Sequence, residues 1–207
     1  MAQRALILVD LQYDFCPGGA LAVAHGDDTI EVANRLAPHF PIVVATQDWH
    51  PPEHQSFAAN HDGAAPYQPI ELHGLAQTLW PVHCVQGSRG AALHDDLDRA
   101  AIAHVFPKGT DPQVDSYSGL WDNGRRKSTG LGEWLRARAV TEVYVLGLAT
   151  DYCVRATAID AVTDGFATFL VEDGCRAVEL TPGDGDRAIA AMRAAGVVVV
   201  DSGQIAR

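Results

Sequence analysis

The chain has 207 residues, of which 47% are hydrophobic, and 15 lysines and arginines against 26 aspartates and glutamates give a formal net charge of −11 at pH 7. This length suits one domain with a sizeable core rather than two domains. The acidic balance argues against nucleic acid and against an anionic membrane surface as partners.

Short apolar runs alternate with helical patterns along most of the chain. The patterns predict strands at residues 5–9, 41–45, 102–106, 141–146, 166–171 and 197–200, and helices at 27–36, 131–137, 155–162 and 184–195. Such alternation is typical of a doubly wound α/β sheet. We therefore expect one α/β domain over residues 1–207, with a mostly parallel six-stranded sheet flanked by helices.

The segment from about residue 47 to about residue 99 interrupts this alternation. It has no long periodic pattern and is rich in proline and glycine, and six of the nine histidines lie in it: His50, His54, His61, His73, His83 and His94. Connections of this length are usually either functional or disordered. Aromatic anchors such as Trp49, Phe57 and Trp80 favour a functional loop region.

Four predicted strands are followed by a polar residue: Asp10, Asp48, Lys108 and Cys153. Parallel strands bring their carboxyl ends to one edge of a sheet, so these side chains should lie close together. The chemistry is coherent, because Asp10 could take a proton from Cys153 while the Lys108 ammonium stabilises both anions. Taken singly, Asp10 could be a turn-forming residue and Lys108 a solvated surface residue.

Cys153 stands between a predicted strand and a predicted helix. Thr150 or Asp151 would be the natural N-cap, which places the thiol in the first helical turn. Unpaired backbone N–H groups and the helix dipole would there favour the thiolate and could also hold an oxyanion. The alternative is a small buried cysteine that only packs.

A second polar cluster is Asp48-Trp49-His50. Two residues apart on an extended segment share a face, so the carboxylate and the imidazole could bind one divalent ion. His83 could complete a set that leaves positions open for water or substrate, and His54 and Ser56 are further candidates. The alternative is a histidine-rich loop held by hydrogen bonds.

The remaining features bear on the compartment. The cysteines, at positions 16, 84, 153 and 175, show no Cys-x-x-Cys pair and no disulfide-like spacing, which indicates reduced thiols. The apolar run near the N-terminus is short and lacks a cleavage site, and no stretch is long enough to cross a membrane. We therefore expect a cytoplasmic protein.

Seven segments together carry a family resemblance. They are residues 10–15 (DLQYDF), 17–21 (PGGAL), 46–51 (TQDWHP) with Ser56-Phe57, 80–85 (WPVHCV), 108–112 (KGTDP), 115–119 (DSYSG) and 147–154 (GLATDYCV). In this order they resemble the nicotinamidases of the isochorismatase-like cysteine hydrolase superfamily. The match runs from about residue 5 to residue 175, and the TQDWHP and WPVHCV segments are narrower markers than the other motifs.

The resemblance implies an isochorismatase-like hydrolase fold and a cysteine mechanism. Asp10, Lys108 and Cys153 would form a catalytic triad. The backbone N–H groups of Ala149 and Cys153 would hold the oxyanion, with a cis peptide bond before Ala149. The implied reaction converts nicotinamide to nicotinate and ammonia through a cysteine thioester, in NAD salvage, and pyrazinamide would react in the same way.

The resemblance also implies a cofactor and a ring slot. Asp48, His50 and His83 would hold one divalent metal, zinc in the first place with iron or manganese as alternatives. Water, Ser56 or His54 would provide a fourth contact. The pyridine ring, with its nitrogen at the metal, would lie in a slot lined by Phe15, Trp80 and Tyr117.

Other readings stay open. Another hydrolase of the superfamily could act on isochorismate, a carbamoyl compound or a different small amide, although isochorismate hydrolases commonly lack the cysteine. A non-catalytic metal or thiol sensor is a rival from another class. We expect a small-molecule substrate and neither nucleic acid nor membrane as a partner, and the sequence leaves a homo-oligomer open.

Overall fold

The computed structural model describes residues 3–205 of the chain. Residues 1–2 and 206–207 belong to the expected domain but lie outside the described residues. Residues 1–2 also begin the segment in which we expect no signal peptide. None of the helices between residues 3 and 205 combines the length and the hydropathy needed to cross a lipid bilayer.

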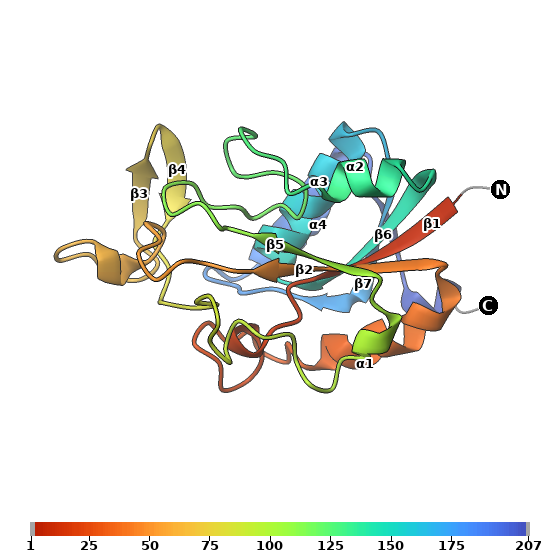
Figure 1. Cartoon of the computed structure of the whole chain (residues 1–207), viewed down its shortest axis with the longest axis horizontal. Coiled ribbons are helices and arrows are strands. Elements are labelled where there is room, and N and C mark those ends of the chain that lie inside the picture. The colour runs from red at the N-terminus through yellow and green to blue at the C-terminus, as the bar shows by residue number, and fades with distance from the viewer. Residues whose placement is uncertain (1–2, 206–207) are drawn as a thin grey trace.

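A six-stranded sheet with the order β5-β2-β1-β6-β7-β8 forms the centre of the molecule (Figure 1). Its strands are β1 (Gln3–Val9), β2 (Ile42–Asp48), β5 (His104–Lys108), β6 (Val140–Leu148), β7 (Ala167–Arg176) and β8 (Val198–Val200). All neighbouring strands in it pair in parallel. The prediction of a mostly parallel six-stranded sheet is therefore confirmed.

The most apolar run of the sequence forms the central strand. Residues 5–9 of β1 are completely or almost completely buried, as expected for a strand with neighbours on both sides and helices on both faces. On one side β1 pairs with β6 in a register that sets Val9 against Gly147. A Cβ at Gly147 would lie 2.1 Å from the Val9 carbonyl oxygen, so only glycine permits this approach.

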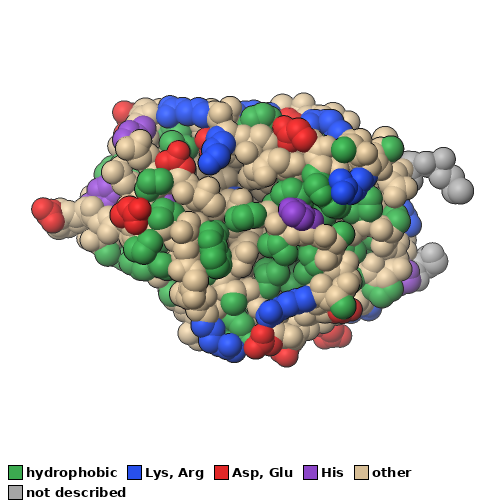
Figure 2. Space-filling model, viewed as in Figure 1, with side chains coloured by type: hydrophobic (Ala, Val, Ile, Leu, Met, Phe, Trp, Pro, Cys, Tyr) green, Lys and Arg blue, Asp and Glu red, His purple; other side chains and the backbone are tan. Residues whose placement is uncertain are grey.

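Four α-helices cover the sheet. They are α1 (Asp28–Leu36), α2 (Leu131–Arg136), α3 (Arg155–Thr163) and α4 (Asp184–Ala194). Figure 1 shows α1 on one face and the other three on the opposite face. On the side of the molecule seen in Figure 2, acidic, basic and hydrophobic side chains are interspersed, without an extended basic surface there.

The connection between β2 and β5 contains a hairpin that the sequence analysis did not predict. Strands β3 (Pro69–Leu72) and β4 (Leu75–Thr78) are antiparallel and lie beyond the carboxyl ends of the sheet strands (Figure 1). His73 and Gly74 form the two-residue turn and have φ angles of 51° and 81°. A turn with two positive φ angles suits a tight hairpin. Strands of four residues are too short to give a clear periodic signal.

Candidate active site and metal centre

The carboxyl edge of the sheet gathers the polar residues that follow its strands. Asp10 comes directly after β1, Asp48 and Lys108 end β2 and β5, and Cys153 follows β6. The Lys108 ammonium lies 2.9 Å from Asp10 Oδ2 and 3.4 Å from Cys153 Sγ. All four side chains are buried. The structure therefore brings the predicted triad together.

Lys108 uses its three N–H groups on three acceptors. They are the Asp48 carboxylate, the carbonyl oxygen of Ser116 at 2.9 Å and Cys153 Sγ at 3.4 Å. Burial opposes the charge, but the carboxylates of Asp10 and Asp48 outweigh it and hold the pKa of Lys108 well above its usual value. Lys108 is therefore a permanent cation at the centre of the cluster.

Asp10 is set up to exchange a proton near neutral pH. Burial raises the pKa of its carboxyl to about 6, with the Lys108 ammonium opposing this shift and the Asp48 charge adding to it. Oδ1 accepts a hydrogen bond of 2.6 Å from the Thr46 hydroxyl. Oδ2 forms the ion pair with Lys108, but no group among residues 3–205 donates a directed hydrogen bond to it. Since Oδ1 accepts the Thr46 hydrogen bond, Oδ2, in its ion pair with Lys108, is the oxygen that would receive a proton.

Cys153 differs from the sequence prediction in two respects. It lies in a single π-helical turn, Thr150–Val154, that precedes α3, and the N-cap is Ala149, not Thr150 or Asp151. Burial raises the pKa of the Cys153 thiol well above its usual value, and although Lys108 opposes this, nearby carboxylates reinforce it. The environment therefore favours the thiol at rest, not the predicted thiolate, and a base must take its proton.

The peptide bond between Leu148 and Ala149 is cis, as the resemblance implies. Ala149 and Cys153 line the same cavity. Within the described residues, no hydrogen-bond acceptor contacts the Ala149 N–H. The oxyanion role of these two N–H groups stays a prediction that the arrangement permits.

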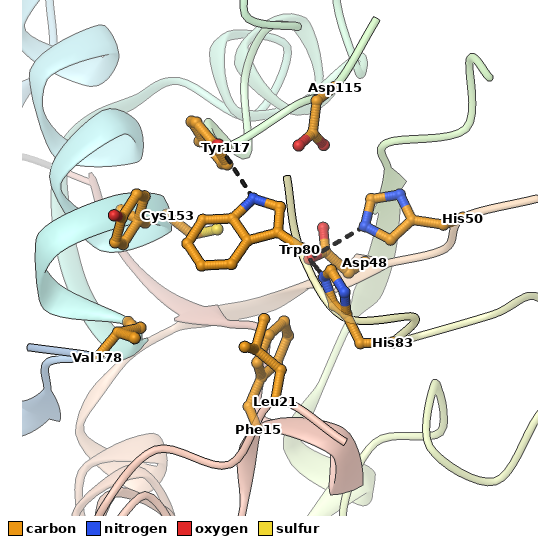
Figure 3. A pocket seen from close by; sticks show the side chains of 12 residues that line it. Phe15, Leu21, Asp48, His50, Trp80, His83, Asp115, Tyr117, Cys153 and Val178 are labelled. Carbon is orange, nitrogen blue, oxygen red and sulfur yellow. Dashed lines mark hydrogen bonds and ion pairs between the residues drawn. The ribbon is translucent and has the colours of Figure 1, made fainter. Parts of the chain in front are cut away.

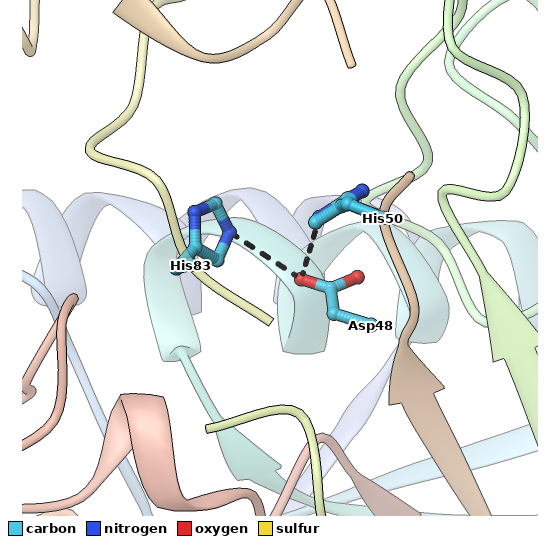
Figure 4. A group of neighbouring side chains, drawn as sticks. All are labelled: Asp48, His50 and His83. Carbon is cyan, nitrogen blue, oxygen red and sulfur yellow. Dashed lines mark ion pairs between the residues drawn. The ribbon is translucent and has the colours of Figure 1, made fainter. Parts of the chain in front are cut away.

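Asp48, His50 and His83 converge on one point (Figure 4). Asp48 Oδ2 lies 3.5 Å from His50 Nε2 and 3.8 Å from His83 Nε2. The other ring nitrogens face backbone carbonyls, since His50 Nδ1 lies 2.9 Å from Gly109 O and His83 Nδ1 lies 2.8 Å from Pro81 O. A carbonyl can only accept, so both Nδ1 atoms donate, and the two Nε2 atoms are left to face Asp48. This donor set fits a divalent metal ion.

The two candidates for a fourth ligand, His54 and Ser56, differ in their contacts. The Ser56 hydroxyl lies 2.7 Å from His54 Nδ1 and so is already engaged. His54 Nε2 is buried and has no hydrogen-bond partner among residues 3–205. Its ligand atom groups with those of His50 and Asp115 within 4.8 Å, and burial lowers the pKa of His54 to about 4. The Ser56 N–H donates to His54 Nδ1 at 3.1 Å, so in the neutral ring Nε2 carries the hydrogen and is a donor without a partner among residues 3–205.

A slot joins the thiol to the metal-ligand set. It is lined by the three predicted ring contacts, Phe15, Trp80 and Tyr117, and by residues that the sequence analysis did not assign to it, which include Leu21, Asp115, Tyr152 and Val178. Trp80 Nε1 donates to the Tyr117 hydroxyl at 3.1 Å. In Figure 3 the Trp80 ring lies between Cys153 on one side and His50 on the other. The slot thus suits a flat ring that reaches from the thiol to the histidines.

The β3–β4 hairpin supports the wall of this slot through Gln77, which contacts two of the lining residues. Its side-chain amide donates to Asp115 Oδ2 at 2.9 Å and lies 3.0 Å from the Tyr117 hydroxyl. In the sequence, Asp115 belongs to one of the family segments but has no predicted role, and Gln77 lies outside all of these segments. Both contacts join segments that are distant in the chain, which no local pattern reveals.

Comparisons with known proteins agree with this arrangement. A family profile described as the isochorismatase domain matches residues 4–204. The nicotinamidase of Escherichia coli (strain K12) is 53% identical over 203 residues, which cover 96% of this chain and 95% of that protein. A solved nicotinamidase pyrazinamidase of Acinetobacter baumanii superposes with a TM-score of 0.96 at 44% identity, over 99% of each chain. The pyrazinamidase of Pyrococcus horikoshii in complex with zinc gives 0.78 at 37% identity, over 96% of this chain and 99% of that one.

Proposed function

The chain belongs to the isochorismatase family, and from its place there and the geometry of its site we propose that it hydrolyses nicotinamide to nicotinate and ammonia. The observation that carries this proposal is the slot itself. A thiol with a lysine and an aspartate lies at one end, an Asp-His-His set lies at the other, and aromatic side chains lie between them. An aromatic amide with a ring nitrogen meta to its amide group matches both ends.

The Asp48, His50 and His83 side chains would hold the metal, and water, Ser56 or His54 would provide the fourth contact. When bound, the ion would supply a Lewis-acidic position for the ring nitrogen of the substrate. Zinc is the proposed ion, because imidazole and carboxylate ligands suit it and a related pyrazinamidase has been solved with zinc. Iron and manganese are the alternatives.

The residues of this chain divide the covalent chemistry between them. Asp10 takes the thiol proton as Cys153 Sγ attacks the amide carbon, and Lys108 stabilises the developing sulfur anion. The C–N bond then breaks as Asp10 returns the proton to the departing nitrogen. Ammonia is released, and the acyl group remains bound to Cys153 as a thioester. Asp10 next takes a proton from water, the water oxygen replaces sulfur, and nicotinate and the free thiol result.

Two further groups would stabilise and orient the substrate. The Ala149 and Cys153 N–H groups hold the oxyanion of each tetrahedral intermediate. Phe15, Trp80 and Tyr117 hold the pyridine ring flat, so that the amide carbon stays over the sulfur. Pyrazinamide carries a ring nitrogen at the same place and should follow the same path.

In this proposal the protein works on a small molecule within NAD salvage. A reducing compartment such as the cytoplasm suits a chain whose four cysteines are all free. A homo-oligomer stays a prediction that light scattering would test. The single domain with a functional loop region at about residues 47–99 also stays a prediction, to be tested by limited proteolysis.

An ammonia-release assay tests the proposal directly. The panel contains nicotinamide, pyrazinamide and an N-carbamoyl amino acid, and the metal content of each protein sample is measured alongside. We expect turnover of the two ring amides by the wild-type protein and none by Cys153→Ala. A preference for the carbamoyl compound would overturn the proposal in favour of another activity of the same superfamily.

A further inference from the structure

Asp151 is a buried carboxylate two residues before the thiol, and the mechanism does not use it. Its Oδ1 accepts the N–H of Val178 at 2.9 Å, and its Oδ2 accepts the N–H of Glu179 at 3.0 Å. Only 3% of the residue is exposed, and it does not line the slot. Both oxygens therefore hold the backbone of the loop that joins β7 to α4.

The same loop is anchored at its other end. The Glu179 carboxylate accepts the N–H groups of Gly183 at 2.6 Å and Gly185 at 2.7 Å, where α4 begins. Glu179 also has a φ of 57°, in the left-handed region that most side chains avoid. Two carboxylates thus hold the loop: Asp151 binds it at Val178 and Glu179, and Glu179 binds the start of α4.

Val178 is the residue of this loop that reaches the substrate slot. Its side chain lines the cavity together with Cys153 and Ala149. Figure 3 shows it on the Cys153 side of Trp80, away from the two histidines. A substrate whose amide lies over the thiol would therefore meet Val178 with the adjacent edge of its ring, not with the nitrogen that faces the metal ligands.

Asp151 lies in the same π-helical turn as Cys153, so its carboxylate links the thiol and the slot wall in one unit. An asparagine in its place would offer one acceptor oxygen and turn an NH₂ group toward the second N–H. The loop would then lose one hydrogen bond and face a donor against a donor.

We propose that Asp151 is a positioning residue that fixes the loop after β7, and that Val178, held by it, limits the size of ring substituent that the slot admits beside the thiol. This inference rests on the proposed function. It adds a specificity determinant to the slot, made by a side chain from β7–α4 that no motif in the sequence marks.

The test compares kcat/KM for nicotinamide with kcat/KM for nicotinamides carrying one methyl group at each ring carbon in turn. A methyl group that meets a tight apolar wall changes such a ratio by about tenfold or more. The methyl ratio is kcat/KM for a methylated substrate divided by kcat/KM for nicotinamide. Val178→Ala should raise this ratio by about tenfold for at least one methylated substrate, and Val178→Leu should lower it. Asp151→Asn should relax the same substrate, and the double variant should relax it little further.

Asp173→Asn is the matched control. The Asp173 carboxylate also holds a backbone N–H of another segment, that of Ser202 at 2.8 Å, but it does not line the slot. Its loss should change stability without changing the methyl ratios. Where Asp151→Asn does not fold, Asp151→Glu, which keeps both oxygens but displaces them, replaces it and should also change the ratio.

Unchanged methyl ratios in both Val178 variants would overturn the role of Val178. Unchanged ratios in a folded Asp151 variant would overturn the role of Asp151. These outcomes differ from failure of the proposed function, which would appear as absence of ammonia release from nicotinamide by the wild-type protein.

Discussion

Asp48 and Lys108 are paired residues on neighbouring parallel strands, and the carboxylate of the first accepts a hydrogen bond from the ammonium of the second. The other oxygen of Asp48 faces His50 and His83. Lys108 in turn contacts the Cys153 sulfur. One ion pair therefore connects the metal-ligand set to the thiol. A substitution in the metal-ligand set should change the electrostatics at Cys153, and a substitution near Cys153 should change those at the metal ligands.

Cys153→Ala should reduce turnover by several orders of magnitude and leave the fold intact, because it removes the nucleophile and only one buried sulfur atom. The measurement is ammonia release, with circular dichroism as the check on folding. Cys16→Ala is the control, since Cys16 does not line the slot, and it should keep nearly full activity. Normal turnover by Cys153→Ala would exclude a covalent mechanism.

Asp10→Asn should cost nearly as much as Cys153→Ala, since the thiol pKa is raised and the sulfur depends on a base. Groups that share one proton transfer have non-additive effects, so the double variant should be little worse than either single one. Kinetics of the four proteins check this. If the two losses multiply, Asp10 and Cys153 act independently.

The pH profile should report Asp10. Its carboxyl has a pKa raised by burial to about 6, and the base must be ionised, so kcat/KM should be full above that pH and fall as pH drops through it. The Thr46 hydroxyl stabilises the carboxylate and lowers this pKa. Thr46→Val keeps the shape without the donor, so the acid limb should move to higher pH. An unmoved limb would assign that limb to another group.

Benzamide tests the contact between the ring and the metal. It has the shape and the amide of nicotinamide but no ring nitrogen. A contact worth only about 1.4 kcal/mol in the transition state makes benzamide about tenfold poorer in kcat/KM. His50→Ala or removal of the metal should abolish most of this discrimination together with most of the rate. Equal efficiency on both amides in the metal-loaded protein would rule out ring coordination.

Gly109→Ala should weaken metal binding although it replaces none of the proposed ligands. A Cβ at Gly109 would lie 2.3 Å from His50 Cε1, so the imidazole would have to move from the carbonyl that orients it. Loss of such an orienting contact typically costs about tenfold or more in metal affinity. Gly63→Ala is the matched control, because Gly63 also has a positive φ but has open space around it. Equal metal titrations for both variants would contradict this account.

The residues that the sequence placed correctly are those whose position depends on the sheet alone. Asp10, Asp48 and Lys108 follow apolar runs that could only be buried strands, and parallel pairing then brings them together. Family motifs located His83 and Trp80, which the loop region would otherwise have hidden. The recognition of an isochorismatase-like nicotinamidase is confirmed by the comparisons.

The features that the sequence did not predict depend on contacts between distant segments. The protonation of Cys153 follows from burial and from three carboxylates that only the folded chain assembles. The sequence predicts Thr150 or Asp151 as a helix N-cap, but the Asp151 oxygens bind the N–H groups of Val178 and Glu179 instead. The hairpin strands were too short to show a period. Tertiary contacts decided each of these outcomes.

The central place of β1 has a consequence for biosynthesis. One edge of this apolar strand is covered by β2, but the other waits for β6, which the ribosome makes after most of the chain. Until then the nascent protein carries an open, aggregation-prone strand edge, the kind of surface that chaperones shield. Cys153 follows β6 closely in the chain, so it is translated just after the strand that will cover that edge. The nascent chain therefore receives its nucleophile only after the strand that covers β1 has been synthesised.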